Sequence, residues 1–413
     1  MPARGKGDTM VGGTGGARLS TAEALGHTVV FGSGSDEKRS VLLDFMEAAA
    51  ADGTGALMID GSGDPDLRFL VEDICRRNGR MEDLWVVDFR ASGTPGDGRR
   101  LDLFRGAPPE AVTAMLAALL DESMGDGAMW KGRALSMLAA VVPALCWLQD
   151  KGELVLSAGI VSDYISLMAL VDLADPKTYP DMPANIRKPV RAYLKSLPGF
   201  MEEKGRAQSQ TTRDQHGYLE MCFTRGLATL DRHAPRILES SVTGRSMAEA
   251  MASDMVTLVL LPSLETAHGE AGVMGKLVLA GLRQAIASAV AAGRRGKWRF
   301  PFFRVVLSEL PDYMLDGMGK LLQVGRVAGV AVTASADSPA RLEMANPAEA
   351  RAVIDNSWNR IYLRMASPEA AAHVRGLPLS FLARRRMLGM GSGDAALVAG
   401  RKARFFKVGT SGP

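Results

Sequence analysis

A glycine-rich turn near the N-terminus has the residue types of a phosphate-binding loop. Such a loop needs backbone N–H groups around phosphate oxygens, a Lys on the outer phosphates and a Ser or Thr hydroxyl on Mg²⁺. Its pattern is G-x-x-x-x-G-K-[ST], placed between a strand and a helix. The segment from Gly32 to Arg39 reads GSGSDEKR and follows the apolar run HTVVF. Gly32, Ser33, Gly34 and Lys38 are therefore candidate nucleotide-binding residues.

Two positions of this loop depart from the pattern. Glu37 stands where the second Gly would admit the triphosphate, and Arg39 stands where the Ser or Thr would hold Mg²⁺. Ser40 can serve Mg²⁺ only after a shift in register, and the Glu37 carboxylate repels a phosphate. Taken alone, the segment fits an ordinary strand-to-helix turn better than a nucleotide site, with Lys38 as a solvated charge.

The elements around this loop predict an α/β fold that is split by a helical insertion. Short apolar runs alternate with helical patterns near both ends of the chain, at 27–31, 56–59, 84–89, 256–261, 304–307, 330–334 and 360–363. Such alternation indicates a mostly parallel sheet covered by helices. We expect a split nucleotide-binding-type domain over residues 26–105 and 245–413, an all-α domain over 106–244, a flexible segment over 1–25 and a loop-like tail over 390–413.

Composition narrows the class of protein. Of the 413 residues 47% are hydrophobic, which excludes wholesale disorder. The 49 basic and 46 acidic residues leave a formal charge of +3, too balanced to indicate nucleic-acid binding from charge alone. The three Cys and five His have no metal-ligand spacing, so no metal site is expected. The longest apolar stretch, 134–148, falls short of the ~20 residues that span a bilayer, which predicts a cytoplasmic protein without a transmembrane helix.

Further segments carry patterns that are not generic to nucleotide-binding proteins. They are His27–Gly32, Ile59–Asp64, Met129–Ala134, Asp214–Arg225, Leu260–Glu265, Gly325–Arg326 and Ala334–Ala340. In these motifs, and in their order over about residues 26–410, the sequence resembles the coupling ATPases of type IV secretion systems. The resemblance is to the IcmO/DotL type, with the related TrbC-like conjugation proteins of the TraG/TraD class. The central matches, MWKGRA and DQHGYL, are the most specific.

This resemblance implies a RecA-like P-loop NTPase core interrupted by an all-α domain and assembled as a ring, a hexamer in the family, with ATP and Mg²⁺ as cofactors. It implies delivery of relaxase–DNA or effector cargo to a type IV channel, together with other secretion components. It also implies a cytoplasmic protein that partners hold peripherally at the bacterial inner membrane. Among site residues, it implies Glu309 as the base and Arg326 as an inter-subunit or sensor residue.

Four motor positions of this family are changed together, at Glu37, Arg39, Ser308 and Ala336. In the family they hold the loop Gly, the Mg²⁺ hydroxyl, the Mg²⁺-positioning Asp and the γ-phosphate-sensing Gln. Losing a single preorganised group typically costs ~10²–10³ in rate. We therefore predict a pseudo-ATPase that serves as a substrate-docking or ring-scaffold subunit, by self-association or in a mixed ring with an active coupling ATPase.

Two alternatives stay open at this point. The first is an active ATP-hydrolysing DNA or protein translocation motor with an unorthodox loop, in which Lys38, Ser40 and Glu309 act. The second is a helical interaction protein with a decayed α/β part and no ring. In a pseudo-ATPase, Glu309 is expected to pair with Arg326 or Arg304 instead of acting as a base.

Overall fold

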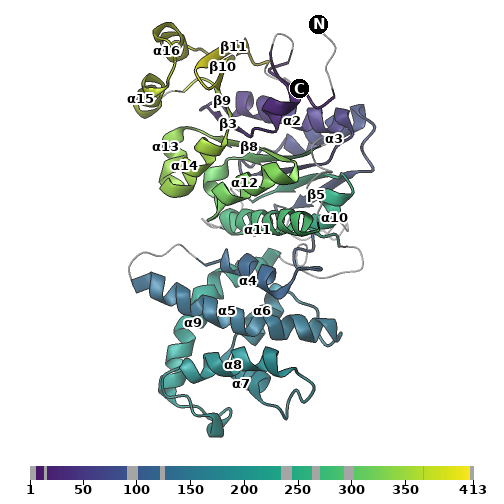
Figure 1. The fold of residues 1–413 in the computed structure, drawn as a ribbon, viewed down its shortest axis with the longest axis vertical. Coiled ribbons are helices and arrows are strands. Elements are labelled where there is room, and N and C mark those ends of the chain that lie inside the picture. The colour runs from purple at the N-terminus through teal and green to yellow at the C-terminus, as the bar shows by residue number, and fades with distance from the viewer. Residues whose placement is uncertain are drawn as a thin grey trace. The chain divides into compact units, whose positions relative to one another are not determined.

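The computed structural model describes residues 6–13, 16–90, 101–120, 126–233, 244–262, 270–292, 302–365 and 367–409. The chain divides into two compact units, which Figure 1 shows in the colours of the chain. The first unit comprises Met1–Thr94, Ala248–Gly275 and Ala285–Pro413, and the second comprises Pro95–Met247 and Lys276–Gln284. The domain boundaries drawn from the sequence stay predictions.

One sheet forms the centre of the first unit. Its order in the described residues is β11 (Lys402–Lys407), β10 (Asp394–Ala399), β9 (Asn359–Tyr362), β3 (Thr28–Phe31), β8 (Val330–Ala336), β7 (Phe303–Ser308), β4 (Ala56–Asp60), β6 (Val256–Leu260) and β5 (Leu84–Asp88). The strands from β9 to β5 are parallel, and β10 and β11 are antiparallel at one edge. Strands β3, β4, β6, β7 and β8 are buried along their whole length, which is typical of parallel strands with helices on both faces. The predicted mostly parallel sheet is confirmed.

Helix α2 (Ser35–Asp52) follows β3 directly and carries the candidate Lys. Its residues Val41, Phe45 and Met46 are at most 3% exposed and pack with α3 (Leu67–Arg77) in the core beneath the sheet. Gly53 ends α2 with a left-handed φ of 70°, a conformation that favours Gly. Because β3, β8, β7 and β4 are parallel neighbours, their carboxyl ends meet at one edge of the sheet, and α2 begins there.

Two stretches differ from the prediction. Within the segment 1–25, expected to be flexible, residues 9–13 and 16–24 include β1 (Thr9–Val11), β2 (Ala17–Leu19) and the short helix α1 (Thr21–Ala24). The tail expected over 390–413 contains β10 and β11, which pair as a hairpin. In both places polar and Gly-rich composition suggests loops, whereas Val11 and Leu19 are fully buried and the backbone of each stretch is paired.

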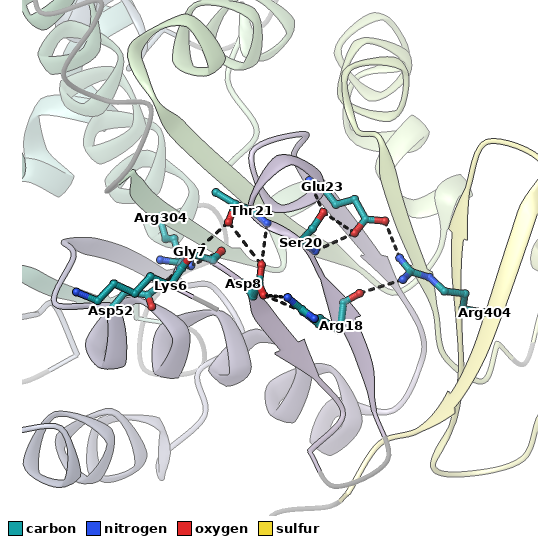
Figure 2. A network of polar contacts seen from close by, with 10 residues as sticks. All are labelled: Lys6, Gly7, Asp8, Arg18, Ser20, Thr21, Glu23, Asp52, Arg304 and Arg404. Atoms are coloured by element: carbon teal, nitrogen blue, oxygen red, sulfur yellow. Dashed lines mark hydrogen bonds and ion pairs between the residues drawn. The ribbon is translucent and has the colours of Figure 1, made fainter. Parts of the chain in front are cut away.

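A polar network joins the N-terminal segment to the sheet (Figure 2). Asp8 accepts hydrogen bonds from the Arg18 side chain at 2.8 Å and from the backbone N–H of Thr21 at 3.1 Å. Arg404 of β11 donates to the Arg18 carbonyl at 3.0 Å and pairs with Glu23 at 2.8 Å. Residues that are far apart in the sequence thus order the N-terminal hairpin, which explains why local composition does not predict it.

The second unit is helical, as predicted for the middle of the chain. Its described residues between 102 and 244 form helices and loops but no strand. The helices are α4 (Pro109–Ala117), α5 (Asp126–Asp150), α6 (Ala158–Tyr164), α7 (Leu167–Ala174), α8 (Ala184–Ser196), the 3₁₀ turn η1 (Glu202–Lys204) and α9 (Gln210–His233). Helix α5 packs against α4, α8 and α9 and so lies at the centre of the unit.

The two most specific sequence motifs meet in this unit. Trp130 of α5 and Tyr218 of α9 have ring centroids 5.7 Å apart. His216 of α9 is fully buried, with its Nε2 2.8 Å from the Ile165 carbonyl and its Nδ1 2.8 Å from the Tyr193 hydroxyl. His216 is therefore a hydrogen-bonded core residue that fixes α9 on α8.

Two helical segments in the described part of the chain, Met129–Asp150 and Ala271–Ala291, are long and apolar enough to span a bilayer by length and composition. In each segment 56% of the most apolar window is buried inside the protein. The buried core helices of soluble proteins share this length and composition. These two properties alone therefore assign neither segment to a membrane.

Candidate phosphate-loop site

The two glycines of the turn between β3 and α2 lie close to neighbouring side chains. A Cβ on Gly32 would lie 2.6 Å from the Cβ of Leu363, just after β9. A Cβ on Gly34 would lie 1.8 Å from Oε2 of Glu37. The structure places both glycines at the carboxyl edge of the sheet, as the sequence predicted. Leu363 already explains why residue 32 is Gly, whereas the Glu37 side chain near Gly34 could move aside.

Glu37, which replaces the second loop Gly, is anchored at the start of α2. Its carboxylate accepts hydrogen bonds from the Ser392 hydroxyl at 2.7 Å and the Gly393 N–H at 3.3 Å. The Ser392 hydrogen bond above all lowers the pKa of Glu37. Ser33 donates from both its N–H and its hydroxyl to the Arg364 carbonyl, at 3.1 and 3.2 Å. A fixed negative charge therefore stands at the helix N-terminus, where a phosphate loop binds its anion.

Lys38, in the first turn of α2, is buried and held by two carboxylates. It is 5% exposed. Its Nζ donates to Oε1 of Glu309 at 2.5 Å and also pairs with the carboxylate of Asp337. Glu309 follows β7 and Asp337 follows β8, so the ends of neighbouring strands converge on one ammonium group. This geometry excludes the alternative that Lys38 is only a solvated surface charge.

Glu309 adopts an uncommon backbone conformation at the end of β7. Its φ and ψ are both 53°, the left-handed region that residues with a Cβ rarely occupy outside functional or constrained sites. Its N–H donates to the Ser335 hydroxyl at 3.1 Å. Burial raises the pKa of Glu309, and the charge of Lys38 opposes that rise. The prediction that Glu309 pairs with Arg326 or Arg304 is wrong, because Lys38 takes that place.

The two arginines lie elsewhere in the unit. Arg326 donates to the Asn356 carbonyl at 2.6 Å and its guanidinium lies 5.1 Å from the ring centroid of Trp358, just before β9. Arg304, at the start of β7, pairs with Asp52 at 3.0 Å. Both are therefore at the amino edge of the sheet, and the structure does not bring them to Lys38. A role for Arg326 across a subunit boundary stays a prediction.

Ser40, the candidate for Mg²⁺ coordination in the loop, does not direct its hydroxyl into the site. The Ser40 hydroxyl donates to the Gly409 carbonyl at 2.8 Å, which directs it toward the C-terminal segment. Arg39, in the place of the metal-binding hydroxyl, pairs with Asp64 at 2.8 Å and with Asp36 at 3.1 Å. The structure thus places Ser40 next to the predicted loop but engages its hydroxyl elsewhere.

A cavity of about 330 Å³ opens beside the first turn of α2, along the ends of β4 and β7. Its charged lining comprises two cations and five carboxylates: Lys38, Arg39, Asp36, Asp60, Asp64, Asp66 and Glu309. A surplus of carboxylates repels a triphosphate, because like charges raise the free energy of a buried anion. The cavity is therefore better suited to a cation-rich group than to a nucleotide phosphate.

Asp60 is a site residue that the sequence reasoning did not single out. It is fully buried at the end of β4 and accepts hydrogen bonds from the N–H and hydroxyl of Ser62, at 3.0 and 2.6 Å. Burial raises its pKa. In the sheet Asp60 is paired in register with Ser308, which occupies the position where the resembled family has its Mg²⁺-positioning Asp. The rule that polar residues at the carboxyl ends of parallel strands line the ligand crevice could have identified it.

Taken together, these side chains do not fit a bound Mg–nucleotide. Glu37 stands where the phosphates would bind, Lys38 is engaged, and the Ser40 hydroxyl is directed away. In the residues that the structure describes, no group of three or more His, Cys, Asp or Glu could hold a metal ion.

Comparison with known proteins shows the relatives of this chain. It is 26% identical over 372 residues to the type 4 coupling protein DotL of Legionella pneumophila, a match that covers 83% of this chain and 47% of DotL. The chain thus spans about half the length of the curated relative it matches. No protein-family model matches it.

Solved structures show the same fold. The unbound conjugative coupling protein TrwB has a TM-score of 0.66 at 11% identity, over 99% of this chain and 90% of that one. TrwB in complex with ADP and Mg²⁺ has a TM-score of 0.68 at 10% identity, with the same coverage. VirB4 of Thermoanaerobacter pseudethanolicus has a TM-score of 0.54 at 12% identity, over 100% and 99%. The predicted RecA-like P-loop NTPase fold is confirmed.

Proposed function

We propose that this chain, which is related to the type IV coupling proteins, is a coupling-protein-like subunit of a type IV secretion or conjugation system that does not hydrolyse ATP. The observation that carries the proposal is the pairing of Lys38 with Glu309 and Asp337 of its own chain. The cation that would bind the outer phosphates already has two anionic partners. The chain keeps the fold of the motor, while the positive charge of Lys38 is neutralised by Glu309 and Asp337.

The cost of breaking this cluster supports the proposal. Nucleotide binding would draw Lys38 away and leave Glu309, whose side chain is 17% exposed, without its counter-charge. Removing one partner from a buried ion pair costs roughly 3–5 kcal/mol. Each 1.4 kcal/mol is about tenfold in affinity, so the cluster alone weakens nucleotide binding by at least about a hundredfold.

A second candidate function, an active ATPase, is favoured by one observation. The left-handed conformation and raised pKa of Glu309, beside Lys38, are features that often mark a catalytic base. In this alternative Mg–ATP releases Lys38, and the carboxylates around the cavity take part in binding the metal. TrwB neighbours are solved with ADP and Mg²⁺ and with a GTP analogue, which makes such binding a proposal worth testing here.

Thermal unfolding with and without Mg–ATP separates the two candidates. A ligand at 100 times its Kd stabilises the folded state by about 2.7 kcal/mol, so a binder shows a clear rise in Tm. We expect no rise for the wild type at millimolar Mg–ATP and no phosphate release.

The matched control for this experiment is the triple variant Glu37→Gly, Arg39→Thr and Ser308→Asp. It restores the loop Gly, the Mg²⁺ hydroxyl and the Mg²⁺ carboxylate but keeps the Lys38 pairs, so we expect measurable nucleotide binding by calorimetry, with an affinity still lowered by that pairing. A wild type that binds Mg–ATP tightly and releases phosphate would overturn the proposal. A triple variant that binds nothing would show that the site has changed beyond these three positions.

The proposed partners are other secretion components, with the second unit as the docking region for relaxase–DNA, effector or adaptor. The support is an exposed cluster where the two specific motifs meet: Met129, Tyr218 and Met221 are 53%, 54% and 70% exposed around the Trp130–Tyr218 contact. Met side chains adapt to varied partners. We further propose self-association or a mixed ring with an active coupling ATPase, and a place in the cytoplasm at the inner membrane.

Co-purification with the coupling complex tests this docking. It should survive Lys38→Ala, because the proposed association does not depend on ATP, and it should be lost in the double variant Tyr218→Ala and Met221→Ser. Met344→Ser is the matched control, since Met344 is 79% exposed on the first unit. Loss of the complex with Lys38→Ala and retention with the double variant would contradict the docking proposal.

A further inference from the structure

The C-terminal segment of the first unit concentrates positive charge. Residues 367–409 contain two acidic side chains, Glu369 and Asp394. The same residues contain eight basic side chains, Arg375, Arg384, Arg385, Arg386, Arg401, Lys402, Arg404 and Lys407. The whole chain carries a formal charge of +3, so the excess of six positive charges here is offset by acidic residues elsewhere. A local excess of this kind selects an anionic partner.

Helix α16 (Phe381–Leu388) adds large apolar side chains to this charge. Phe381, Leu382 and Leu388 are 69%, 74% and 45% exposed. Arg385 is also exposed and lies one turn from both Phe381 and Leu388, so they share one side of the helix. Figure 1 shows α16 beside α15 (Pro368–Gly376), near the antiparallel strands β10 and β11. The exposed side of α16 is thus apolar and cationic together.

Contacts on the inner side of α16 hold this face outward. Ser380 caps the helix, because its hydroxyl oxygen accepts a hydrogen bond from the Ala383 N–H at 3.2 Å. Arg384 donates to carbonyls at the end of α15, including that of Leu377 at 3.3 Å. The Arg386 guanidinium lies 4.1 Å from the ring centroid of Phe405 in β11. Because the helix is capped and packed, the exposure of its apolar residues is a built feature of the fold.

We propose that the face of α16 formed by Phe381, Leu382, Arg385 and Leu388 docks on an anionic lipid membrane. Apolar side chains that enter the boundary between headgroups and acyl chains, next to basic residues that bind anionic headgroups, are the two components of interfacial binding. The surrounding basic residues of the segment supply the charge complementarity. A nucleic acid would use the arginines but would bury little of Phe381, Leu382 and Leu388, so the apolar exposure favours lipid.

This inference goes beyond the proposed function, and either can fail without the other. It does not depend on nucleotide binding, on a ring or on cargo. It assigns membrane contact to this chain itself, whereas the proposed function leaves that contact to partners.

The test is co-sedimentation of the full chain with vesicles. We expect binding to vesicles made of equal parts phosphatidylglycerol and phosphatidylcholine, little binding to phosphatidylcholine alone, and weaker binding as salt rises. Arg385→Glu changes the charge by two, which at about fivefold per charge lowers partition about 25-fold. The double variant Phe381→Ser and Leu382→Ser should lower partition about a hundredfold.

Two control variants match these changes on other surfaces of the same unit. Phe69→Ser alters a Phe that is 63% exposed on α3, next to acidic residues. Arg351→Glu reverses an exposed Arg on α14 (Pro347–Asn356). Both should bind vesicles like the wild type. All four variants change exposed side chains, and an unchanged Tm shows that each is folded.

Three results would overturn the proposal. The first is absence of wild-type binding to the anionic vesicles, or equal binding to neutral ones. The second is binding of a single-stranded oligonucleotide through Arg385 without vesicle binding, which would make this a nucleic-acid surface. The third is a change of oligomeric state in the Phe381→Ser and Leu382→Ser variant without vesicle binding, which would make it an interface between copies.

Discussion

Replacing Lys38 by Met is expected to destabilise the protein because it leaves a buried carboxylate without its counter-charge. The Glu309 side chain is 17% exposed, whereas that of Asp337 is 58% exposed and stays hydrated. Breaking a buried pair costs roughly 3–5 kcal/mol, and an exposed pair contributes about 0–1 kcal/mol. Because Glu309 keeps some contact with solvent, we expect a loss at the lower end, about 3 kcal/mol. In a unit of this size that corresponds to a fall in Tm of about 6–12 °C.

The loss should depend on pH in a defined direction. Burial raises the pKa of Glu309 in the folded protein, and removing Lys38 raises it further. An acid whose folded pKa lies above its unfolded value, about 4.3 for Glu, stabilises the fold below that value, and this stability is lost as pH rises through the folded pKa. The deficit of Lys38→Met against the wild type should therefore be small near pH 4 and full near pH 8.

Urea unfolding at both pH values measures this deficit, with Lys38→Met plus Glu309→Gln as the matched variant. The second change removes the charge that the first leaves unpaired, so it should recover most of the stability and abolish the pH-dependent part. If Lys38→Met is as stable as the wild type at pH 8 and loses nucleotide binding instead, Lys38 serves a phosphate and the internal-pairing argument is refuted.

Two further predictions concern buried polar groups. Burial raises the pKa of Asp44 to about 7, although its carboxylate accepts a hydrogen bond from the Gly12 N–H at 2.7 Å. Asp44→Asn keeps that acceptor without the charge, so the variant should gain stability over the wild type between about pH 4 and pH 7, up to about 4 kcal/mol. Urea unfolding at several pH values measures this gain, and a gain that does not change with pH would contradict the prediction. Tyr193→Phe leaves Nδ1 of His216 unpaired in the core and should cost about 1–3 kcal/mol, whereas an unchanged urea midpoint would mean that this hydrogen bond contributes nothing.

The sequence predicts the buried strands well because each is an uninterrupted apolar run. It does not predict β10 and β11, although a signal is present: Gly400 and Arg401 form a two-residue connection between them, and Gly400 has the positive φ of 59° that such turns need. In β11 buried and exposed residues alternate, with Phe406 facing the core and Lys407 facing solvent. The Gly, Ser and Arg residues around the turn make this alternation of apolar and polar residues hard to recognise in the sequence. The N-terminal hairpin is concealed for the same reason.

The sequence names Lys38 and Glu309 as candidate site residues, but it does not name Asp60 or Asp337 and does not predict which residues pair. Lys38 lies in the helix after β3, Glu309 follows β7 and Asp337 follows β8. Lys38 and Glu309 are 271 residues apart, and their pairing depends on β8 lying between β3 and β7, an order that local patterns do not contain. Ser40 shows the converse, because its partner Gly409 belongs to the end of the chain that the sequence describes only as a tail.

The charges around α2 also explain how Lys38 can be kept in a site that, as we propose, does not bind a nucleotide phosphate. The N-terminus of a helix is the positive end of its dipole, so cations in the first turn are unfavourable unless anions lie close by. A nucleotide supplies such anions in a working phosphate loop. Here Glu309 and Asp337 supply them to Lys38, and Asp64 supplies one to Arg39. The same carboxylates that stabilise these cations repel a triphosphate, so the stability of the fold and the proposed low affinity for nucleotide follow from one arrangement.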